Sequence, residues 1–306
     1  MALLEGKVAI VTGAGRGVGR GEALALASHG ARVIVNDVGV AVDGSGGEQG
    51  PAEEVVEQIR AAGGEAAANF ENISTWDGAE RLINQAIDTW GQLDILVNNA
   101  GILRDRIIWN MTEEEWDAVI AVHLKGTFCT TRHAVGHWRA KHKGGESVSG
   151  RRIINTASAA MLGNPGQANY AAAKGAIAAF TLTVAVEVQG MGITCNAIRP
   201  SAATRMTQDV GAGPPPEGSD KSEEFNPRDP VHVGEFVSYL ASDAAQWISG
   251  QLFSAYGDKM HLTKGWHTVN TIEKPGVGWT AEELVTAMPK LAGMSPVSMI
   301  EQLGFG

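Results

Sequence analysis

Short apolar runs alternate with amphipathic segments along most of the chain. The run Lys7–Thr12 is continuous and β-branched, which is typical of a strand buried on both faces of a parallel sheet. The segment Arg20–His29 is rich in Ala and Leu and is followed by Gly30, a residue that often ends a helix. The pattern therefore predicts a strand and then a helix at the start of the chain.

The same alternation continues to Ser242. It predicts further strands at Arg32–Asn36, Glu65–Phe70, Leu93–Asn98, Arg152–Thr156 and Ile193–Ile198. It predicts further helices at Pro51–Ala62, Asp77–Trp90, Thr112–His137, Tyr170–Gln189 and Pro230–Ser242. Strands and helices at this spacing form right-handed βαβ units. The expected fold class is α/β, a single Rossmann-like, doubly wound parallel sheet flanked by helices.

Three stretches interrupt this rhythm. Residues 39–50 and 211–227 are rich in Gly or Pro and are expected to be loops beside a ligand. From Lys259 the alternation stops, and the remaining residues are punctuated by prolines. We predict one domain over residues 1–258 and a C-terminal extension over 259–306 that packs on it or on a neighbouring subunit.

Composition narrows the class of protein. Of the 306 residues 44% are hydrophobic, which is too many for an intrinsically disordered chain. The net charge of −10 argues against a nucleic-acid partner. The apolar runs are far shorter than the ~18 residues that span a bilayer, so no membrane contact is expected.

Two features favour a cytoplasmic location. Cys129 and Cys195 are too few for a disulfide framework. The first residues, Met1–Lys7, lack the charged-then-apolar layout of a signal peptide. We therefore expect a cytoplasmic protein.

Glycines are concentrated where the first predicted strand meets the first predicted helix. The segment Thr12–Gly19 has glycine at four of its eight positions: Gly13, Gly15, Gly17 and Gly19. A pyrophosphate site needs a sharp turn without Cβ atoms, a close backbone and a helix N-terminus that faces the anion. The segment therefore predicts a dinucleotide cofactor.

The second predicted strand is followed directly by Asp37. An acid there can accept hydrogen bonds from the adenosine ribose and repels a 2′-phosphate. Arg16 would favour a cofactor that carries the 2′-phosphate, because a guanidinium can pair with that phosphate. Asp37 stands at the discriminating position, so we expect NAD rather than NADP.

Tyr170 and Lys174 stand four residues apart, on one face of a predicted helix. A phenol has a pKa of about 10, which is too high for a base at neutral pH. A neighbouring ammonium favours the phenolate, so the pair could exchange a proton with a substrate hydroxyl or carbonyl.

Together these motifs resemble the short-chain dehydrogenase/reductase family over about residues 5–258. The matching motifs are the glycine segment 12–19, Asn98-Asn99-Ala100-Gly101, Ser158, the pair Tyr170 and Lys174, Asn196 with Pro200 and Thr204, and residues 248–251. Within the family, residues 35–37, 101–106, 122–126 and 166–170 are similar to the (3R)-hydroxyacyl-CoA dehydrogenase branch, which includes part of peroxisomal multifunctional enzyme type 2 (a 17β-hydroxysteroid dehydrogenase) and bacterial stand-alone relatives.

The resemblance implies an NAD-dependent oxidoreductase that interconverts a secondary alcohol and a ketone, with a 3-hydroxyacyl-CoA or steroid-like substrate. Tyr170 would be the acid/base, Lys174 would lower its pKa and hold the nicotinamide ribose, and Ser158 would bind the substrate oxygen. The implied cofactor-binding residues are Gly13, Arg16, Gly17, Val18, Gly19, Asp37, Asn72, Asn99, Ala100, Gly101, Tyr170, Lys174, Pro200 and Thr204. Family members commonly form homotetramers or dimers through two helices, and we expect a homo-oligomer.

The chain departs from the family pattern at several positions. The usual serine stands thirteen residues before the tyrosine, which here is Ala157; aligning the strand instead selects Ser158 and shortens the following loop. His123 replaces a usual asparagine, and both a packing role and a catalytic proton-relay role are open. Asn72 replaces an aspartate near the adenine, and Ser201 replaces a glycine.

Two other functions stay open. The first is an NADPH-dependent 3-oxoacyl-thioester reductase, and the second is a non-catalytic dinucleotide-binding sensor. A metal site is not expected: His133 and His137 have a zinc-like spacing, but no acidic third ligand follows closely.

Overall fold

The computed structural model describes residues 2–47, 50–202, 225–264, 268 and 270–292. It divides the chain into two compact units, Met1–Thr263 and Lys264–Gly306. The first unit holds the sheet, and the second holds helix α8 (Ala281–Ala292). Each unit is described by itself.

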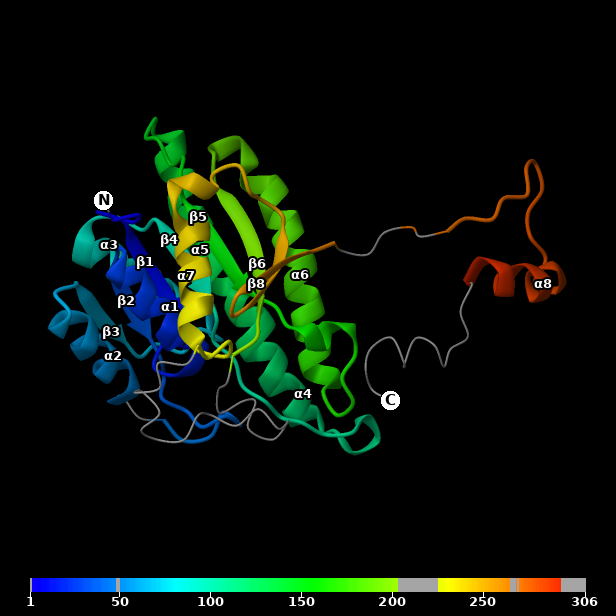
Figure 1. Cartoon of the computed structure of the whole chain (residues 1–306), viewed down its shortest axis with the longest axis horizontal. Coiled ribbons are helices and arrows are strands. Elements are labelled where there is room, and N and C mark those ends of the chain that lie inside the picture. Colours follow the sequence, from blue (N-terminus) through cyan, green and yellow to red (C-terminus); the bar gives the residue numbers. More distant parts are fainter. Residues whose placement is uncertain (1, 48–49, 203–224, 265–267, 269, 293–306) are drawn as a thin grey trace. The chain divides into compact units, whose positions relative to one another are not determined.

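One eight-stranded sheet organises the first unit, in the order β3-β2-β1-β4-β5-β6-β7-β8 (Figure 1). The strands are β1 (Val8–Thr12), β2 (Arg32–Asn36), β3 (Ala66–Asn69), β4 (Ile95–Asn98), β5 (Arg152–Thr156), β6 (Thr194–Pro200), β7 (Leu252–Tyr256) and β8 (Lys259–Thr263). Strands β1 to β7 pair in parallel, and β8 pairs antiparallel with β7. The predicted doubly wound, Rossmann-like fold is confirmed.

Helices cover both faces of this sheet. They are α1 (Gly17–Ser28), α2 (Gly50–Ala61), α3 (Trp76–Trp90), α4 (Glu113–Ile120), α5 (Gly126–Lys143), α6 (Ala168–Val188) and α7 (Pro230–Ala241). One buried cluster joins α1, α2 and α7 to the sheet, and a second joins α3, α5 and α6 to the opposite face. Strands are added to one side of β1 as far as β3 and to its other side from β4 onward, and a crevice is expected outside the carboxyl ends of β1 and β4, where this order reverses.

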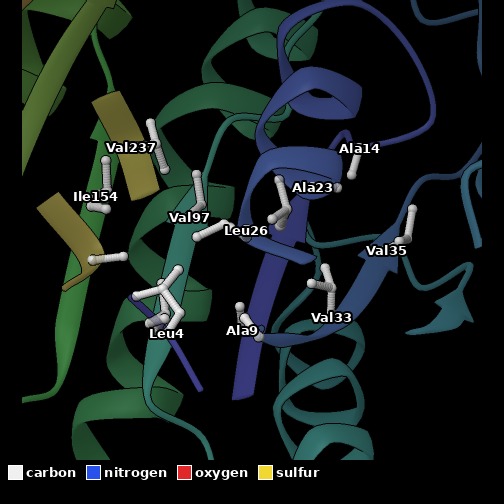
Figure 2. Close-up of a cluster of buried hydrophobic side chains, with 14 of the residues drawn as sticks. Leu4, Ala9, Ala14, Ala23, Leu26, Val33, Val35, Val97, Ile154 and Val237 are labelled. Atoms are coloured by element: carbon white, nitrogen blue, oxygen red, sulfur yellow. The ribbon is translucent and has the colours of Figure 1, made fainter. Parts of the chain in front are cut away.

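Figure 2 shows why the strand sequences are nearly continuous apolar runs. Ala9, Val33 and Val97 project from neighbouring strands into the first cluster, where they meet Leu26 of α1 and Val237 of α7. All five side chains are fully buried. Burying a Val or Leu side chain contributes about 1.5–3 kcal/mol to stability, so a sheet covered by helices carries apolar residues on its covered faces.

The predicted helix Thr112–His137 is interrupted in the structure. Thr112 and Glu115 form a capping box at the start of α4. A π-helical turn, Ala121–Lys125, then separates α4 from α5 and directs His123 into the interior. Turns of this kind often lie at functional sites.

The sheet continues past the boundary predicted after residue 258. Strand β8 extends the sheet from Lys259 to Thr263, because Gly257 turns the chain at φ 51° and lets β8 fold back onto β7. The compact unit therefore ends at Thr263. In the second unit, Lys274 forms an ion pair with Glu283 near the start of α8.

Helix α6 is apolar on several faces. Among the described residues, Ala168–Met191 is the one helical stretch long and apolar enough to cross a membrane. It lies against β5 and β6 and carries the buried Lys174, as a core helix does. Cys129 and Cys195 are both buried and unpaired.

Candidate active site

The glycine segment forms a tight loop between β1 and α1. Gly13 and Gly17 adopt φ values of 63° and 56°, which L side chains rarely adopt. A Cβ on Gly19 would lie 2.3 Å from the Gly13 carbonyl oxygen, so only glycine fits there. No side chain caps the first turn of α1, which leaves its N-terminal amides available to an anion.

Asn99 fixes this loop from the neighbouring strand. Its Nδ2 donates to the carbonyl oxygens of Thr12 at 3.0 Å and Gly13 at 3.1 Å. The Thr12 hydroxyl in turn accepts from the amides of Asn99 and Ala100. Asn99 therefore shapes the cofactor loop through its side chain.

Asp37 lies at the open end of the loop. Its Oδ2 accepts from the Gly15 amide at 2.8 Å, and its Oδ1 accepts from the Gly39 amide at 2.7 Å. These two bonds fix the carboxylate beside the glycine segment. Each oxygen keeps a further lone pair for a ligand hydroxyl.

The other predicted cofactor residues differ in their surroundings. Arg16 is the residue before α1, and Val18 packs on the first cluster from the start of that helix. Asn72 is exposed, and its Oδ1 already accepts from the amide and hydroxyl of Ser74. Pro200 ends β6 opposite Ala255, and Thr204 lies outside the described residues.

Tyr170, Ser158 and Lys174 come together at the carboxyl end of β5. Ser158 lies close enough to Tyr170 for its side chain to oppose the rise in the pKa of the phenol. Lys174 lies with its Nζ 5.5 Å from the centre of the Tyr170 ring. Ala157 is buried in an apolar cluster instead, so the geometry favours the strand alignment that selects Ser158.

The expected lowering of the Tyr170 pKa is not found. Desolvation raises the pKa of Tyr170 above its usual value, the side chain of Ser158 opposes this, and the charge of Asp105 adds to the rise. Lys174 does not reverse this direction. Its ammonium donates to the Thr156 carbonyl at 2.5 Å, and burial lowers the pKa of Lys174 to about 7.

His123 touches the edge of the Tyr170 ring, with 5.0 Å between ring centres and 88° between planes. Its Nε2 lies 3.1 Å from the amide nitrogen and 2.8 Å from the carbonyl oxygen of Ile102. Burial, with the charge of Lys174, lowers the pKa of His123 to about 3. A ring that is neutral at physiological pH favours the packing role over the proton-relay role.

Gly101, which follows β4, lies against the ring of His123. A Cβ on Gly101 would lie 2.2 Å from the His123 Cε1 atom. The glycine therefore provides room for the imidazole. The size of the side chain at position 123 explains why glycine follows Ala100.

Two residues of this region were missed as functional candidates. Asn169 is fully buried, and its Nδ2 donates to the carbonyl oxygens of Arg104 and Glu115 while its Oδ1 accepts from the Tyr170 amide. Its position directly before Tyr170 in a family motif was the available signal. Glu22 of α1 is a buried acid, and the Ala- and Leu-rich pattern of this helix does not predict one.

Comparison with known proteins identifies the family. A family model described as short chain dehydrogenase matches residues 7–214. The chain belongs to the short-chain dehydrogenase family. It is an oxidoreductase that acts on CH–OH groups, as the sequence predicted, and members of the family bind NAD or NADP.

Several relatives cover most of this short-chain dehydrogenase. It is 45% identical to hydroxyacyl-CoA dehydrogenase ChsB1 of Mycobacterium tuberculosis, over 96% of this chain and 91% of that protein. It is 41% identical to a 3-oxoacyl-[acyl-carrier-protein] reductase of Synechocystis, over 84% and 98%. A crystal structure of a short chain dehydrogenase from Mycobacterium avium has a TM-score of 0.83 and 47% identity, over 95% of this chain and 96% of that one.

The predicted likeness to a branch of the family is also confirmed. Peroxisomal multifunctional enzyme type 2 of Mus musculus is 45% identical over 67% of this chain, which corresponds to 27% of that larger protein. The interconversion of an alcohol and a ketone follows from the family and these relatives. The roles of individual site residues stay predictions.

Proposed function

We propose that this enzyme interconverts 3-hydroxyacyl-CoA and 3-oxoacyl-CoA thioesters with NAD as the hydride carrier. One observation carries the proposal: the glycine segment with Asp37 and the group of Ser158, Tyr170 and Lys174 occupy the same edge of the sheet. One relative is named a hydroxyacyl-CoA dehydrogenase, and another is named a reductase of 3-oxoacyl groups on acyl carrier protein.

The residues at this edge fit a dinucleotide. Glycines with positive φ allow a tight turn whose backbone can approach a pyrophosphate closely. The uncapped N-terminus of α1 would face that pyrophosphate. When bound, the nicotinamide accepts the hydride from the alcohol or returns it to the ketone. The remaining chemistry belongs to the side chains.

The side chains move one proton and hold the substrate oxygen. In the oxidation direction, the Tyr170 phenolate takes the hydroxyl proton of the substrate, while Ser158 donates a hydrogen bond to the same oxygen. In the reduction direction, Tyr170 returns that proton. Lys174 offers a positive charge beside the phenol whenever it holds its own proton, which favours the phenolate.

Asp37 supports NAD as the cofactor. Its carboxylate is fixed by the amides of Gly15 and Gly39, so it is not free to turn away from a 2′-phosphate. Arg16 stands at the start of α1, where its guanidinium makes no capping bond. A fixed negative charge at the ribose position disfavours NADP.

Initial rates test the proposal directly. A series of 3-hydroxyacyl-CoA thioesters and one 17β-hydroxysteroid are each assayed with NAD and with NADP. We expect thioester oxidation with NAD, at a kcat/KM about tenfold or more above that with NADP, since one charge repulsion is worth at least this factor in a protein site. A strong preference for NADPH would favour the reductase. No hydride transfer with any substrate would favour the sensor.

The oligomeric state is also part of the proposal. Helices α5 and α6 expose apolar side chains, among them Phe128, Leu182 and Val186, the last 74% exposed. A groove of about 520 Å³ between these helices is lined by Phe128, Phe180 and Val184. A second copy of the chain would cover this face. Light scattering of wild type and Val186→Lys tests it: the wild type should be a dimer or tetramer and the variant smaller.

A further inference from the structure

The connection between β2 and α2 is long for its place in the fold. It runs over residues 37–49, whereas a strand and the helix that follows it are usually joined by about 2–6 residues. Irregular connections of more than about 12 residues are uncommon and usually carry a function. The contacts of its described part, residues 37–47, indicate what that function is.

The connection begins at the residue that is predicted to hold the cofactor ribose. The Gly39 amide donates to Asp37 Oδ1 at 2.7 Å, and the Gly15 amide donates to Asp37 Oδ2 at 2.8 Å. Gly39 has a φ of 71°, which lets the chain turn sharply after β2. The carboxylate of Asp37 is therefore bound to the glycine segment through one oxygen and to the start of the connection through the other.

The connection then reaches the segment that follows β4. The Val42 carbonyl oxygen accepts from the Leu103 amide at 2.8 Å. We call residues 39–42 the strap. In the sheet, β1 lies between β2 and β4. The strap therefore extends from the carboxyl end of β2 to that of β4, past the end of β1, where the glycine segment begins.

A turn just after the strap holds its far end in place. The Gly44 amide donates to the Ala41 carbonyl oxygen at 2.9 Å, and Gly44 has a φ of 85°. A Cβ on Gly44 would lie 3.0 Å from the Ile102 Cδ1 atom. Glycine at this position therefore allows both the turn and the close approach to Ile102.

Val40 attaches the middle of the strap to the catalytic side of the site. It is partly buried and packs against the apolar cluster of Ile102, Val119 and Ala173. Tyr170 packs against the same cluster. The strap thus contacts Asp37 at its start and shares an apolar cluster with the candidate catalytic phenol.

The strap and the predicted cofactor site span the same two points. Asp37 is the predicted ligand of the adenosine ribose, and Lys174 is the predicted ligand of the nicotinamide ribose. The glycine segment 12–19, the predicted pyrophosphate site, follows β1, which lies between β2 and β5 in the sheet. A dinucleotide held by these residues would therefore extend along the strap.

We propose that the strap retains the bound cofactor, and that Val40 and Gly44 are positioning residues that keep it attached. The inference rests on the proposed function, because that function supplies the dinucleotide. A backbone hydrogen bond and a few apolar contacts hold the far end, so the strap can open locally while the sheet stays folded. Opening precedes release of the cofactor, so weaker strap contacts speed release more than they slow binding.

Two glycine variants form a matched pair. Gly44→Leu and Gly46→Leu place the same side chain at similar backbone conformations, with φ values of 85° and 75°. Both therefore strain the backbone in the same way. A Cβ at position 44 meets Ile102, whereas a Cβ at position 46 meets no described atom within 4 Å. Gly44→Leu should detach the strap, and Gly46→Leu should leave it attached.

The dissociation rate of the cofactor measures the effect without any turnover. Bound NADH, which is fluorescent, is displaced by excess NAD in a stopped-flow instrument. The rate should rise about tenfold or more in Gly44→Leu, with a matching rise in Kd, and stay within about twofold of the wild type in Gly46→Leu. Val40→Ser, which places a hydroxyl against the apolar cluster, should act in the same direction as Gly44→Leu. Equal rates in the two glycine variants would overturn the inference.

Hydrogen exchange at the Leu103 amide reports the attachment itself, because this amide donates to Val42. In the wild type, saturating NAD should slow this exchange by about tenfold or more, since a bound cofactor favours the attached state. Without cofactor, the amide should exchange faster in Gly44→Leu than in Gly46→Leu. Exchange in the wild type that is unchanged by NAD would contradict the proposal.

The strap and the proposed function can fail separately. A wild type that shows these binding and exchange effects but oxidises no thioester would overturn the proposed function alone. A wild type that oxidises thioesters while the two glycine variants release NADH equally fast would overturn the strap alone. If Gly44→Leu does not fold, Val40→Ser and the wild-type exchange with NAD decide the question.

Discussion

Lys174 donates its ammonium to the backbone carbonyl oxygen of Thr156 at 2.5 Å, across the contact between α6 and the carboxyl end of β5. Ser158 follows Thr156 by two residues, and Tyr170 precedes Lys174 by one helical turn. The bond therefore ties α6, which carries Tyr170 and Lys174, to the end of β5, just before Ser158. Sites built on such elements hold their geometry better than sites on loops.

Replacing Ser158 tests which residue binds the substrate oxygen. Ser158→Ala should lower kcat by about 10²–10³-fold, the usual cost of removing one donor to a developing oxyanion. The double variant Ala157→Ser, Ser158→Ala should not recover activity, because Ala157 is buried among apolar side chains. Steady-state rates check both variants. Recovery in the double variant would mean that position 157 carries the role.

Replacing Asp37 tests the cofactor preference. Asp37→Asn keeps the size of the side chain but removes the charge, so binding of NADP should strengthen by about tenfold relative to NAD. Titration of tryptophan fluorescence with each cofactor measures the ratio of the two Kd values. Asp43→Asn, in the exposed loop nearby, is the control. An unchanged ratio in Asp37→Asn would contradict the assignment of Asp37 to the ribose.

Gly101 and His123 should be energetically coupled. Gly101→Ala places a methyl group against the imidazole and should lower the free energy of unfolding by about 1–3 kcal/mol. His123→Ala opens space there, so the double variant should be less destabilised than the sum of the single ones. Denaturant unfolding of all four proteins measures the coupling. Strict additivity would contradict the contact.

The pH profile of His123→Gln separates the two roles of this residue. The pKa of His123 is lowered to about 3, so no limb of the rate profile above that pH should belong to it. The variant should keep the shape of the wild-type profile while losing stability. A limb near neutral pH that disappears in His123→Gln would restore the proton-relay interpretation.

The sequence was informative where one residue type has one physical use. The strand Arg152–Thr156 was predicted with the bounds that β5 has, because β-branched residues such as Ile153, Ile154 and Thr156 favour strands. The glycines of the cofactor loop were predicted for a similar reason. At Gly13 and Gly17 the backbone conformation itself requires glycine.

The sequence was less informative where the cause lies far away in the chain. The π-helical turn at Ala121–Lys125 leaves the apolar pattern of its helix nearly unchanged, so one long helix was predicted. The burial of Glu22 depends on elements that follow it much later. The pKa of Tyr170 was predicted in the wrong direction, because a residue spacing carries no information on desolvation.

One comparison tests the central claim most directly: NADH formation from a 3-hydroxyacyl-CoA by the wild type, Tyr170→Phe and Tyr239→Phe. Tyr170→Phe should lower kcat by about 10²–10⁴-fold or more, which is the rate enhancement that a general acid–base group usually supplies. Its Kd for NAD should stay within about twofold of the wild-type value. Tyr239→Phe, on α7, should behave as the wild type. Turnover by Tyr170→Phe at the wild-type rate would contradict the account.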